Sequence, residues 1–518
     1  MTKTENNENE IVVRNFLYYF KELWKDSKPL AKLFRTDSAA YLYDTGTNKL
    51  LSCSDAEYDF INSFISTDID QAFNKVICKY KREEILPAFQ NIKKAIEKEN
   101  ILLIQKPTRF GLSYHYKNIE SLINTRLGMI QLETTERCNF RCEYCIYNSQ
   151  VLDKRNHGNR NMTLPIAYAA IDYLAEHSKK RQDICVSFYG GEPLLRFPFI
   201  KSCVDYAHSR IGGKEIRFAL TTNVSLMTSE MADYYYKNNF GITASLDGPE
   251  DVNDEYRKDI KGQPTFKRIM IGLKKLIDVF GQNSHRVSLS MVYAPPYNEQ
   301  RIKRVSELWD EIPWLPKDIG ILITYPHPGS VALDRLPKGN FIDVGLFDWA
   351  RNEYLDSYIR KEKSHVLARS MVEKKLATIF QRSIYKKPTD KYHLNGCCLP
   401  AVRKIFVSVD GELHLCERLP IAPSIGHVNS GVSIERVKDI YINEYGKKSL
   451  PFCASCWAIQ LCHICYLHSF SNGMIDLNKK SKNCIMARFS IEEDLQFFSK
   501  LLEIDNKGLD YLSKWVIV

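Results

Sequence analysis

Apolar and polar positions change their period at about residue 123. From there, short apolar runs typical of buried strands alternate with longer stretches of helical spacing. This alternation predicts a mostly parallel sheet built from repeated strand-helix units, the α/β fold class. We expect strands at residues 128–133, 184–189, 287–292 and 320–324, two more ending near 223 and 245, and a helix at 164–178.

The chain before this sheet follows a different pattern. Residues 11–24 have the spacing of an amphipathic helix, which Pro29 and polar residues then interrupt. Residues 39–52 form two short apolar segments around a Gly/Asn turn, which predicts a β-hairpin. A hairpin with three helices is a winged-helix arrangement, and helical patterns follow at 54–66, 69–79 and 83–99.

These patterns predict six consecutive regions. We expect an N-terminal helical segment, a winged-helix-like α+β domain, the α/β domain, a bridging region with a helix near 346–382, a cysteine-rich domain with a hairpin at 409–413, and a C-terminal helix. The expected boundaries are 1–35, 36–122, 123–325, 326–395, 396–490 and 491–518.

Composition fits this division. With 518 residues the chain exceeds one ordinary core, and 44% apolar with 26% charged residues is typical of a soluble globular protein. The net charge of +10 has no Lys/Arg block, which favours a solvated surface over a nucleic-acid interface. No signal-peptide pattern and no run near the roughly 20 apolar residues of a spanning helix is present. We therefore expect a cytoplasmic protein without nucleic-acid or membrane partners, whose clustered cysteines bind metal.

Three cysteines directly follow the first expected strand. Cys138, Cys142 and Cys145 have the spacing C-x3-C-x2-C. Thiolates at this density favour iron-sulfur or zinc, and a cubane [4Fe-4S] cluster takes four ligands. Three cysteines therefore leave one iron open to a ligand from outside the protein, whereas zinc is more often held by two CxxC pairs.

This loop resembles the signature of the radical S-adenosylmethionine (SAM) enzymes, in which an aromatic residue, here Tyr144, precedes the third cysteine. The resemblance implies a partial (β/α)6 TIM-like barrel with the loop at the C-terminal end of its first strand. It also implies that SAM chelates the open iron and that an electron from the cluster generates a 5'-deoxyadenosyl radical, which abstracts a substrate hydrogen. A flavodoxin or ferredoxin is the expected electron donor.

Further motifs match positions at which the family binds SAM. Gly190, Gly191 and Glu192 follow the second strand. Glycines allow a backbone to approach a ligand closely, and a carboxylate accepts hydrogen bonds from an ammonium group. In the family this element holds the methionine amine of SAM.

Polar residues end the next two strands and are expected at the barrel mouth. They are Asn223, Ser245 and Asp247. By resemblance, Ser245 and Asp247 contact the ribose or carboxylate region of SAM, and Arg257 pairs with its carboxylate. Asn253 stands where the family more often has His, and residues 294–297 depart from the family pattern, so we expect no adenine contact there.

Seven cysteines in the C-terminal part form a second pattern, too many for one four-ligand cluster. It resembles the SPASM extension of peptide-modifying radical enzymes, which binds two auxiliary [4Fe-4S] clusters, although the last spacing here is C-x2-C instead of C-x3-C. The resemblance assigns an outer cluster to Cys453, Cys456, Cys462 and Cys484, and an inner cluster to Cys398, Cys416 and Cys465.

The inner cluster is one ligand short unless Cys397 contributes, and a vacant iron would be able to bind a substrate thiolate. With the cluster expected at the Cys138 loop, three clusters are expected in all. Zinc knuckles are the alternative for the CxxC pairs. The isolated cysteines are expected to pack in the core, and they are Cys53, Cys78, Cys185 and Cys203.

The N-terminal pattern resembles the precursor-peptide recognition domain of peptide-modifying enzymes, which adds a leader peptide as a strand at a sheet edge. Together these resemblances imply a maturase that binds the leader of a ribosomally made precursor and abstracts a hydrogen from a core residue. The expected product is a thioether between a cysteine sulfur and a carbon, with a carbon-carbon crosslink as the other product.

Two other functions stay open. An anaerobic sulfatase-maturing enzyme would oxidise Cys or Ser to formylglycine with an Asp base after the hairpin cysteine, where this chain has Glu417. We expect Glu417 near the inner cluster, either as a catalytic base with a raised pKa or as an exposed partner of Arg403 or Arg418. A DNA-binding redox sensor is the third interpretation, although a complete SAM-binding set is more than a sensor needs.

Overall fold

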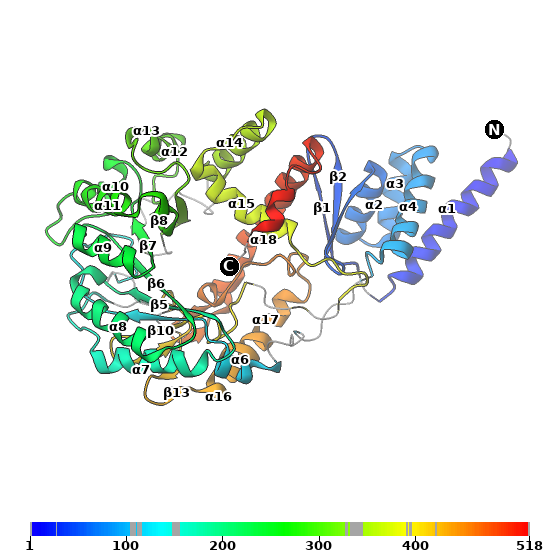
Figure 1. Ribbon diagram of the computed structural model, residues 1–518. Coiled ribbons are helices and arrows are strands. Elements are labelled where there is room, and N and C mark those ends of the chain that lie inside the picture. Colours follow the sequence, from blue (N-terminus) through cyan, green and yellow to red (C-terminus); the bar gives the residue numbers. More distant parts are fainter. Residues whose placement is uncertain are drawn as a thin grey trace.

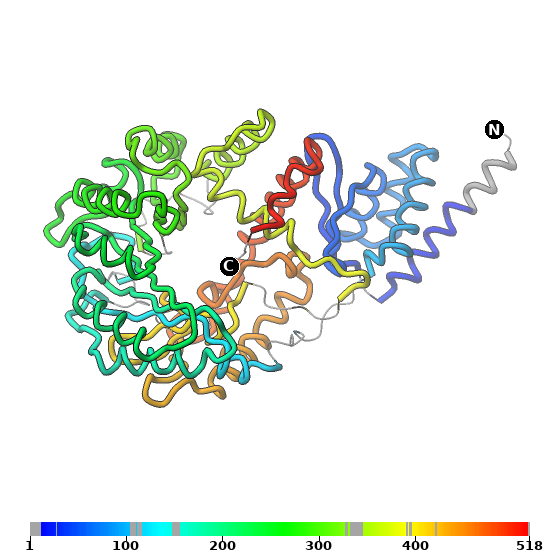
Figure 2. The backbone as a smooth tube through the Cα atoms, viewed as in Figure 1, coloured from blue at the N-terminus to red at the C-terminus, as the bar shows by residue number. Residues whose placement is uncertain are grey.

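The computed structural model describes residues 3–26, 28–103, 110, 117–147, 156–326, 330–331, 345–389, 392, 396–419 and 422–515. Parts of the predicted winged-helix domain and of the predicted bridging region lie outside these residues. Figure 1 shows an N-terminal unit (blue), a curved sheet with helices outside it (cyan to green) and a C-terminal region between the two (orange to red). In Figure 2 the backbone trace places the N-terminal unit (blue) and the curved sheet (cyan to green) at opposite ends of the molecule.

The N-terminal unit is a three-stranded antiparallel sheet covered by helices. The predicted hairpin is confirmed as β2 (Ala40–Asp44) and β3 (Lys49–Cys53), but β1 (Ala31–Arg35) adds a strand that the sequence analysis did not predict. Helix α1 (Lys3–Leu23) contributes Phe20 to the same core, where its ring packs on Trp24 and Phe60. The remaining helices are α2 (Asp55–Ser66), α3 (Ile69–Lys79) and α4 (Arg82–Glu99).

A sheet of ten strands forms the centre of the molecule, in the order β13-β12-β11-β10-β4-β5-β6-β7-β8-β9. The strands from β4 to β9 are parallel, as the sequence pattern predicted, because each β-α-β connection returns the chain in the same direction. They are β4 (Met129–Glu133), β5 (Asp183–Tyr189), β6 (Glu215–Thr222), β7 (Phe240–Ser245), β8 (Val287–Val292) and β9 (Gly320–Thr324).

Helices on the outside of this sheet bury its apolar face in one large core. They are α6 (Ile119–Thr125), α7 (Leu164–His177), α8 (Phe197–Arg210), α9 (Ser229–Lys237), α10 (Glu250–Tyr256), α11 (Phe266–Phe280), α12 (Glu299–Ser306) and α13 (Leu308–Glu311), with short 3-10 turns η1 (Pro193–Arg196) and η2 (Gly281–Arg286). None of the helices in the described part of the chain is long and apolar enough to span a membrane.

The cysteine-rich region extends the same sheet, which the sequence analysis did not predict. Strand β10 (Ile405–Val407) is parallel to β4 and continues through β11 (Glu412–His414), β12 (Gly426–His427) and β13 (Gly431–Val432). The predicted hairpin after Val409 therefore lies next to the first strand of the barrel. The other short elements are α16 (Ile434–Arg436), η4 (Val437–Glu444), α17 (Tyr445–Cys453), η5 (Tyr466–His468), β14 (Phe470–Ser471), β15 (Met474–Ile475) and η6 (Asp510–Lys514).

Two helices differ from the prediction. The helix expected near 346–382 is divided into α14 (Leu346–Arg360) and α15 (Val366–Phe380), because Lys361 adopts a left-handed conformation that ends the first helix. The C-terminal helix expected at 491–518 begins earlier, as α18 (Leu477–Ile504). Cys484 is consequently a helical residue inside α18, and the predicted boundary at 490 falls within that helix.

Candidate active site

The barrel mouth opens into a cavity of about 880 Å³ that the three cysteines Cys138, Cys142 and Cys145 line. Their loop follows β4, at the C-terminal edge where barrels of parallel strands bind ligands. Burial raises the pKa of the Cys138 thiol, and neighbouring Glu192, Cys142 and Cys145 raise it further. The structure therefore brings the three predicted cysteines together at one end of the cavity.

The two glycines after β5 allow the cysteine loop to pack against the sheet. The amides of Gly191 and Glu192 donate to the carbonyls of Thr135 (2.7 Å) and Arg137 (2.8 Å). A Cβ atom on Gly191 would lie 2.1 Å from the Arg137 oxygen, and one on Gly190, whose φ is 135°, would lie 2.4 Å from that of Thr135. Both glycines line the cavity, but the backbone that they approach most closely is that of the cysteine loop.

Glu192 is fully buried and holds the ends of two strands together. Its carboxylate accepts hydrogen bonds from the Leu194 amide (2.9 Å), the Thr222 hydroxyl (2.6 Å) and the Asn223 amide (2.8 Å). Burial raises the pKa of Glu192, and these hydrogen bonds oppose it. A carboxylate has about four lone-pair sites, so one remains for a donor in the cavity.

Tyr144, Asp247 and Arg257 form one buried polar chain. The Tyr144 hydroxyl donates to the Asp247 carboxylate and accepts a 2.9 Å hydrogen bond from Arg257 Nη1. Asp247 also accepts from the Val292 amide at 3.0 Å, so it lies behind Tyr144 and outside the set of residues that line the cavity. Arg257 lines the cavity, and its buried Nε has no hydrogen-bond partner among the described residues. An orphaned guanidinium donor fits an anionic group such as the carboxylate of SAM.

The remaining predicted SAM contacts line the same wall. Asn223 is oriented by two neighbours, because its amide nitrogen donates to Asn139 Oδ1 (2.9 Å) and its oxygen accepts from the Ser225 hydroxyl (2.7 Å). Ser245 faces the cavity near Ser290 of the next strand. The predicted residues thus meet at one edge of the sheet, with Asp247 acting through Tyr144.

The opposite wall of the cavity comes from the predicted bridging region and from the C-terminal segments that carry Cys462, Cys465 and Cys484. Helix α15 contributes Lys374 and Thr378, α18 contributes Asn483 and Asp494, and the loop after Leu461 contributes His463 and further residues. The cavity therefore lies between the barrel and these C-terminal segments, and a ligand in it contacts both.

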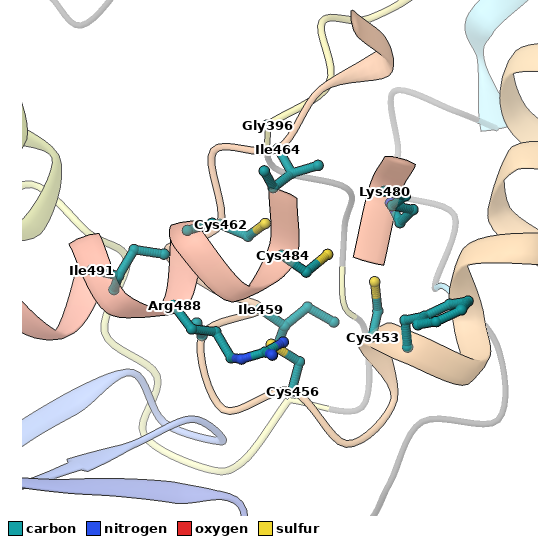
Figure 3. A pocket seen from close by; sticks show the side chains of 13 residues that line it. Gly396, Cys453, Cys456, Ile459, Cys462, Ile464, Lys480, Cys484, Arg488 and Ile491 are labelled. Carbon is teal, nitrogen blue, oxygen red and sulfur yellow. The ribbon is translucent and has the colours of Figure 1, made fainter. Parts of the chain in front are cut away.

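The outer set of cysteines converges as predicted (Figure 3). Cys453 from the end of α17, Cys456 and Cys462 from the following loop and Cys484 from α18 surround a cavity of about 30 Å³. Burial raises the pKa of Cys453 to about 12 and that of Cys462 to about 11. Four soft thiol ligands match a [4Fe-4S] cluster. Among the described residues, no group of three or more His, Cys, Asp or Glu side chains has the geometry of a metal site.

The cysteines assigned to the inner set form two neighbouring groups. Cys465 lies close to both Cys398 and Cys397. The Cys398 thiol raises the pKa of Cys465, and Cys465 raises the pKa of the Cys397 thiol. Cys398 is exposed, whereas the Cys397 thiol is buried and lies 3.8 Å from the Ile464 carbonyl. Cys416 stands at the end of the hairpin, beside Glu417 and near Tyr189.

Glu417 lies near the inner set, but its ionisation differs from the prediction. Its side chain is 14% exposed and forms an ion pair with Lys404, not with Arg403 or Arg418. Burial alone would raise the pKa of Glu417, but the Lys404 ammonium and hydrogen bonds to the carboxylate together outweigh burial and hold the pKa below its ordinary value. The predicted raised pKa is therefore wrong, because Lys404, the residue directly before β10, places a cation beside the carboxylate.

Three residues of the site were not predicted from the sequence. They are Asn139, which orients Asn223, Lys404, which pairs with Glu417, and Lys480, which lines the outer cysteine cavity. Lys480 had a usable signal, since it precedes Cys484 by four positions in a helical pattern and therefore shares its face. Lys404 had none, because its partner is adjacent only after the hairpin forms.

Residues 132–308 match the model of the Radical SAM superfamily. This range contains the Cys138 loop and every predicted SAM-contacting residue up to Arg257. The chain therefore contains a radical SAM domain.

Relatives support the same domain over different lengths. An uncharacterized protein of Methanocaldococcus jannaschii is 26% identical over 319 residues, which are 61% of this chain and 94% of the relative. A serine-type anaerobic sulfatase-maturating enzyme of Bacteroides thetaiotaomicron is 30% identical over 143 residues, which are 27% of this chain and only 34% of the relative.

Among solved structures, native anSMEcpe with bound AdoMet and Cp18Cys peptide aligns with a TM-score of 0.52 at 16% identity. The alignment covers 75% of this chain and 100% of that chain. At this identity the likeness shows a shared fold. The chain thus has a mixed α/β fold with a radical SAM domain at residues 132–308, and part of it is similar in sequence to an anaerobic sulfatase-maturating enzyme.

Proposed function

We propose that this protein is a radical SAM maturase that modifies a ribosomally synthesised precursor peptide by forming thioether crosslinks from cysteine sulfur to carbon. The observation that carries this proposal is the cavity that joins the Cys138 loop and Arg257 at one end to the cysteine-rich region at the other. Its volume of about 880 Å³ lies at the upper end of small-molecule pockets, roughly 300–1,000 Å³. This leaves room for a substrate side chain beside SAM.

A [4Fe-4S] cluster on Cys138, Cys142 and Cys145 with SAM, when bound, supplies a 5'-deoxyadenosyl radical for hydrogen abstraction. The protein binds and orients the ligand. Arg257 offers an unpaired Nε donor to a carboxylate, and Glu192 keeps one acceptor site for an ammonium group. The buried chain from Asp247 through Tyr144 fixes the guanidinium of Arg257.

The C-terminal cysteines hold two auxiliary clusters in this proposal. The outer set supplies four thiolates, and the inner set supplies Cys398, Cys416 and Cys465, with Cys397 available close to Cys465. A substrate thiol that reaches the inner set from the cavity would lie near Cys416 and Tyr189, the side of the barrel mouth that faces the Cys145 thiol. Glu417 is there to accept a proton from it. A flavodoxin or ferredoxin supplies the electrons.

The N-terminal unit binds the leader peptide in this proposal. Among the described residues, the outer strands β1 and β3 of its sheet pair only with β2, so each has one edge to which an extended peptide can add. The structure of anSMEcpe was solved with a bound peptide, which supports a peptide as the substrate class.

Two observations weigh against the other functions. Formylglycine formation in the resembled maturases uses an Asp base after the hairpin cysteine, whereas this chain has Glu417, and the matched sulfatase-maturating relative is covered over only 34% of its length. A DNA-reading wing needs an exposed hairpin turn, yet Thr45 and Thr47 of this turn are fully buried.

The test is anaerobic incubation of the reconstituted protein with SAM, dithionite and a short cysteine-containing peptide encoded beside its gene. A maturase releases 5'-deoxyadenosine and a peptide that has lost two hydrogens per crosslink and no longer reacts with a thiol reagent. Formylglycine would instead react with a hydrazide. A hydrazide-reactive product that contains no crosslink would overturn the thioether assignment.

A further inference from the structure

Lys480 is a buried cation beside the outer cysteine set (Figure 3). It is only 2% exposed. Its ammonium donates a 2.9 Å hydrogen bond to the Tyr445 hydroxyl and lies 4.6 Å from the centre of that ring. Among the described residues, it has no carboxylate within ion-pair distance. A buried ammonium is costly unless an opposite charge compensates it.

In the described part of the chain, the charged side chains that line the small cavity beside Lys480 are all cations. Lys480 and Arg488 are its cations, and its lining contains no Asp or Glu among the described residues. The groups that face the ammonium are thiols, since Lys480 lowers the pKa of Cys453, Cys462 and Cys484 against the effect of burial. The counter-charge is therefore an anionic group held by these cysteines.

Helix geometry fixes this arrangement. Lys480 and Cys484 are four residues apart in α18 and so lie on one face of the helix. Tyr445, at the start of α17, holds the ammonium in place and also hydrogen-bonds to Ser469 and the Cys397 thiol. The ammonium thus sits where the outer set meets Cys397 of the neighbouring inner set.

We propose that Lys480 is the buried counter-charge of an outer [4Fe-4S] cluster and that it raises the reduction potential of this cluster. The inference rests on the proposed function only in that the outer cysteines hold a cluster. A thiolate-ligated cluster is anionic and gains one negative charge when an external donor reduces it, so a fixed cation nearby favours the reduced state. Lys480 is a positioning residue in this role.

The experiment is a redox titration of the anaerobically reconstituted full chain with dithionite, followed by EPR of each reduced cluster. Three variants are compared, Lys480→Met, Lys480→Arg and the control Lys482→Met, which removes an exposed lysine from the same helix. In Lys480→Met the ratio of reduced to oxidised outer cluster at fixed potential should fall at least tenfold, a shift of about 59 mV for one electron. Lys480→Arg should restore it, and Lys482→Met should match the wild type.

An unchanged potential in Lys480→Met, with four outer irons retained, would overturn the inference. Where Lys480→Met does not fold, Tyr445→Phe is used, which keeps the ring and frees the ammonium; the outer potential should shift in this variant, and no shift would overturn the inference. Failure of the proposed function is seen separately. If mutation of Cys453 and Cys456 removes no iron from the wild type, there is no outer cluster and the auxiliary-cluster assignment itself is wrong.

Discussion

Thr45 donates a 2.7 Å hydrogen bond to the carbonyl of Trp457 and so joins the turn of the N-terminal hairpin to the loop that carries Cys456 and Cys462. The Gln460 amide returns a 3.3 Å hydrogen bond to the Thr45 carbonyl. The ring of Tyr43 packs edge-on against Trp457 with ring centres 6.2 Å apart. The N-terminal unit and the outer cysteine loop therefore share an interface, and each is expected to stabilise the other.

Thr45→Val should weaken the outer cysteine site without affecting the barrel. The variant leaves the Trp457 carbonyl unsatisfied in a buried interface, a cost of roughly 1–3 kcal/mol. We expect a lower Tm and faster loss of about a third of the iron to a chelator, with uncoupled SAM cleavage unchanged. The control is Thr67→Val, which removes a hydroxyl hydrogen bond of equal length, 2.7 Å, inside the N-terminal unit. Equal iron loss in both variants would disprove the coupling.

The same interface changes how leader binding is tested. Deletion of residues 36–105 would remove Thr45 and expose Trp457, so loss of modification in that variant would not isolate leader recognition. Point variants at the outer edge of β3 leave the interface intact and are the better probe. Leader affinity should be micromolar or better, because strand addition uses backbone hydrogen bonds along a preformed edge.

Arg257→Met should weaken SAM binding. The variant removes the one orphaned guanidinium donor that lines the cavity near the cysteine loop, so the Kd for SAM should rise at least tenfold, about 1.4 kcal/mol, with iron content unchanged. Arg268→Met is the matched control. Its guanidinium also lies over the Phe140 ring, at 5.6 Å, but it pairs with Asp259 outside the cavity. Isothermal titration of SAM into both variants under anaerobic conditions measures the two dissociation constants. Equal values would show that Arg257 does not bind SAM.

Local motifs explain what the sequence could predict. The spacing of Cys138, Cys142 and Cys145 places three thiols in one loop whatever surrounds it, and strand periodicity places Asn223 and Ser245 at one sheet edge. The strands at 287–292 and 320–324 are confirmed to the residue for the same reason, since each is marked by its own apolar run.

Contacts between distant segments could not be predicted. Glu133, which ends β4, accepts hydrogen bonds from the Tyr147 hydroxyl (2.7 Å) and the Val409 amide (3.0 Å), and so links the cysteine loop to a hairpin 276 positions away. Nothing in the pattern around residue 409 indicates that partner. The ion pair of Lys404 and Glu417 also could not be predicted from local sequence. The two residues meet only when the hairpin after β10 has formed, and β10 is placed in the sheet by its pairing with β4.

Gly191→Ala should disrupt the cysteine loop. The added Cβ would lie 2.1 Å from the Arg137 carbonyl oxygen, a backbone atom that can move only with the loop. We expect a loss of roughly 1–3 kcal/mol or more in the free energy of unfolding and poor retention of the SAM-binding cluster. Gly212→Ala is the control, since its Cβ would meet no atom within 4 Å. Denaturant unfolding and iron analysis of both variants test this, and a Gly191→Ala protein with normal iron would contradict it.

Cysteine substitutions should divide the bound iron into thirds. Three [4Fe-4S] clusters correspond to about twelve irons per chain. Replacing Cys138, Cys142 and Cys145 with Ala should remove about one third of the iron together with all SAM cleavage. Replacing Cys453 and Cys456 should remove another third and leave SAM cleavage in place. An iron content near four in the wild type, insensitive to the second substitution, would rule out the auxiliary clusters.

Glu417→Gln should separate hydrogen abstraction from product formation. Lys404 keeps the Glu417 carboxylate ionised next to the Cys416 thiol, which lies 3.3 Å away, so a proton acceptor stands beside the proposed inner cluster. Removing a general base commonly costs about 10²–10⁴-fold, and we expect crosslinked product to fall at least tenfold. All clusters should remain, and deuterium from labelled substrate should still enter 5'-deoxyadenosine.

Lys404→Met is the matched variant for this prediction. It removes the other half of the ion pair but keeps the carboxylate, so product should persist at a level well above that of Glu417→Gln. If the pair serves only to stabilise the hairpin end, both variants should lower Tm by similar amounts and give normal product. Mass spectrometry of the peptide and thermal unfolding of both proteins distinguish these outcomes, and normal yield in Glu417→Gln would exclude Glu417 from the reaction.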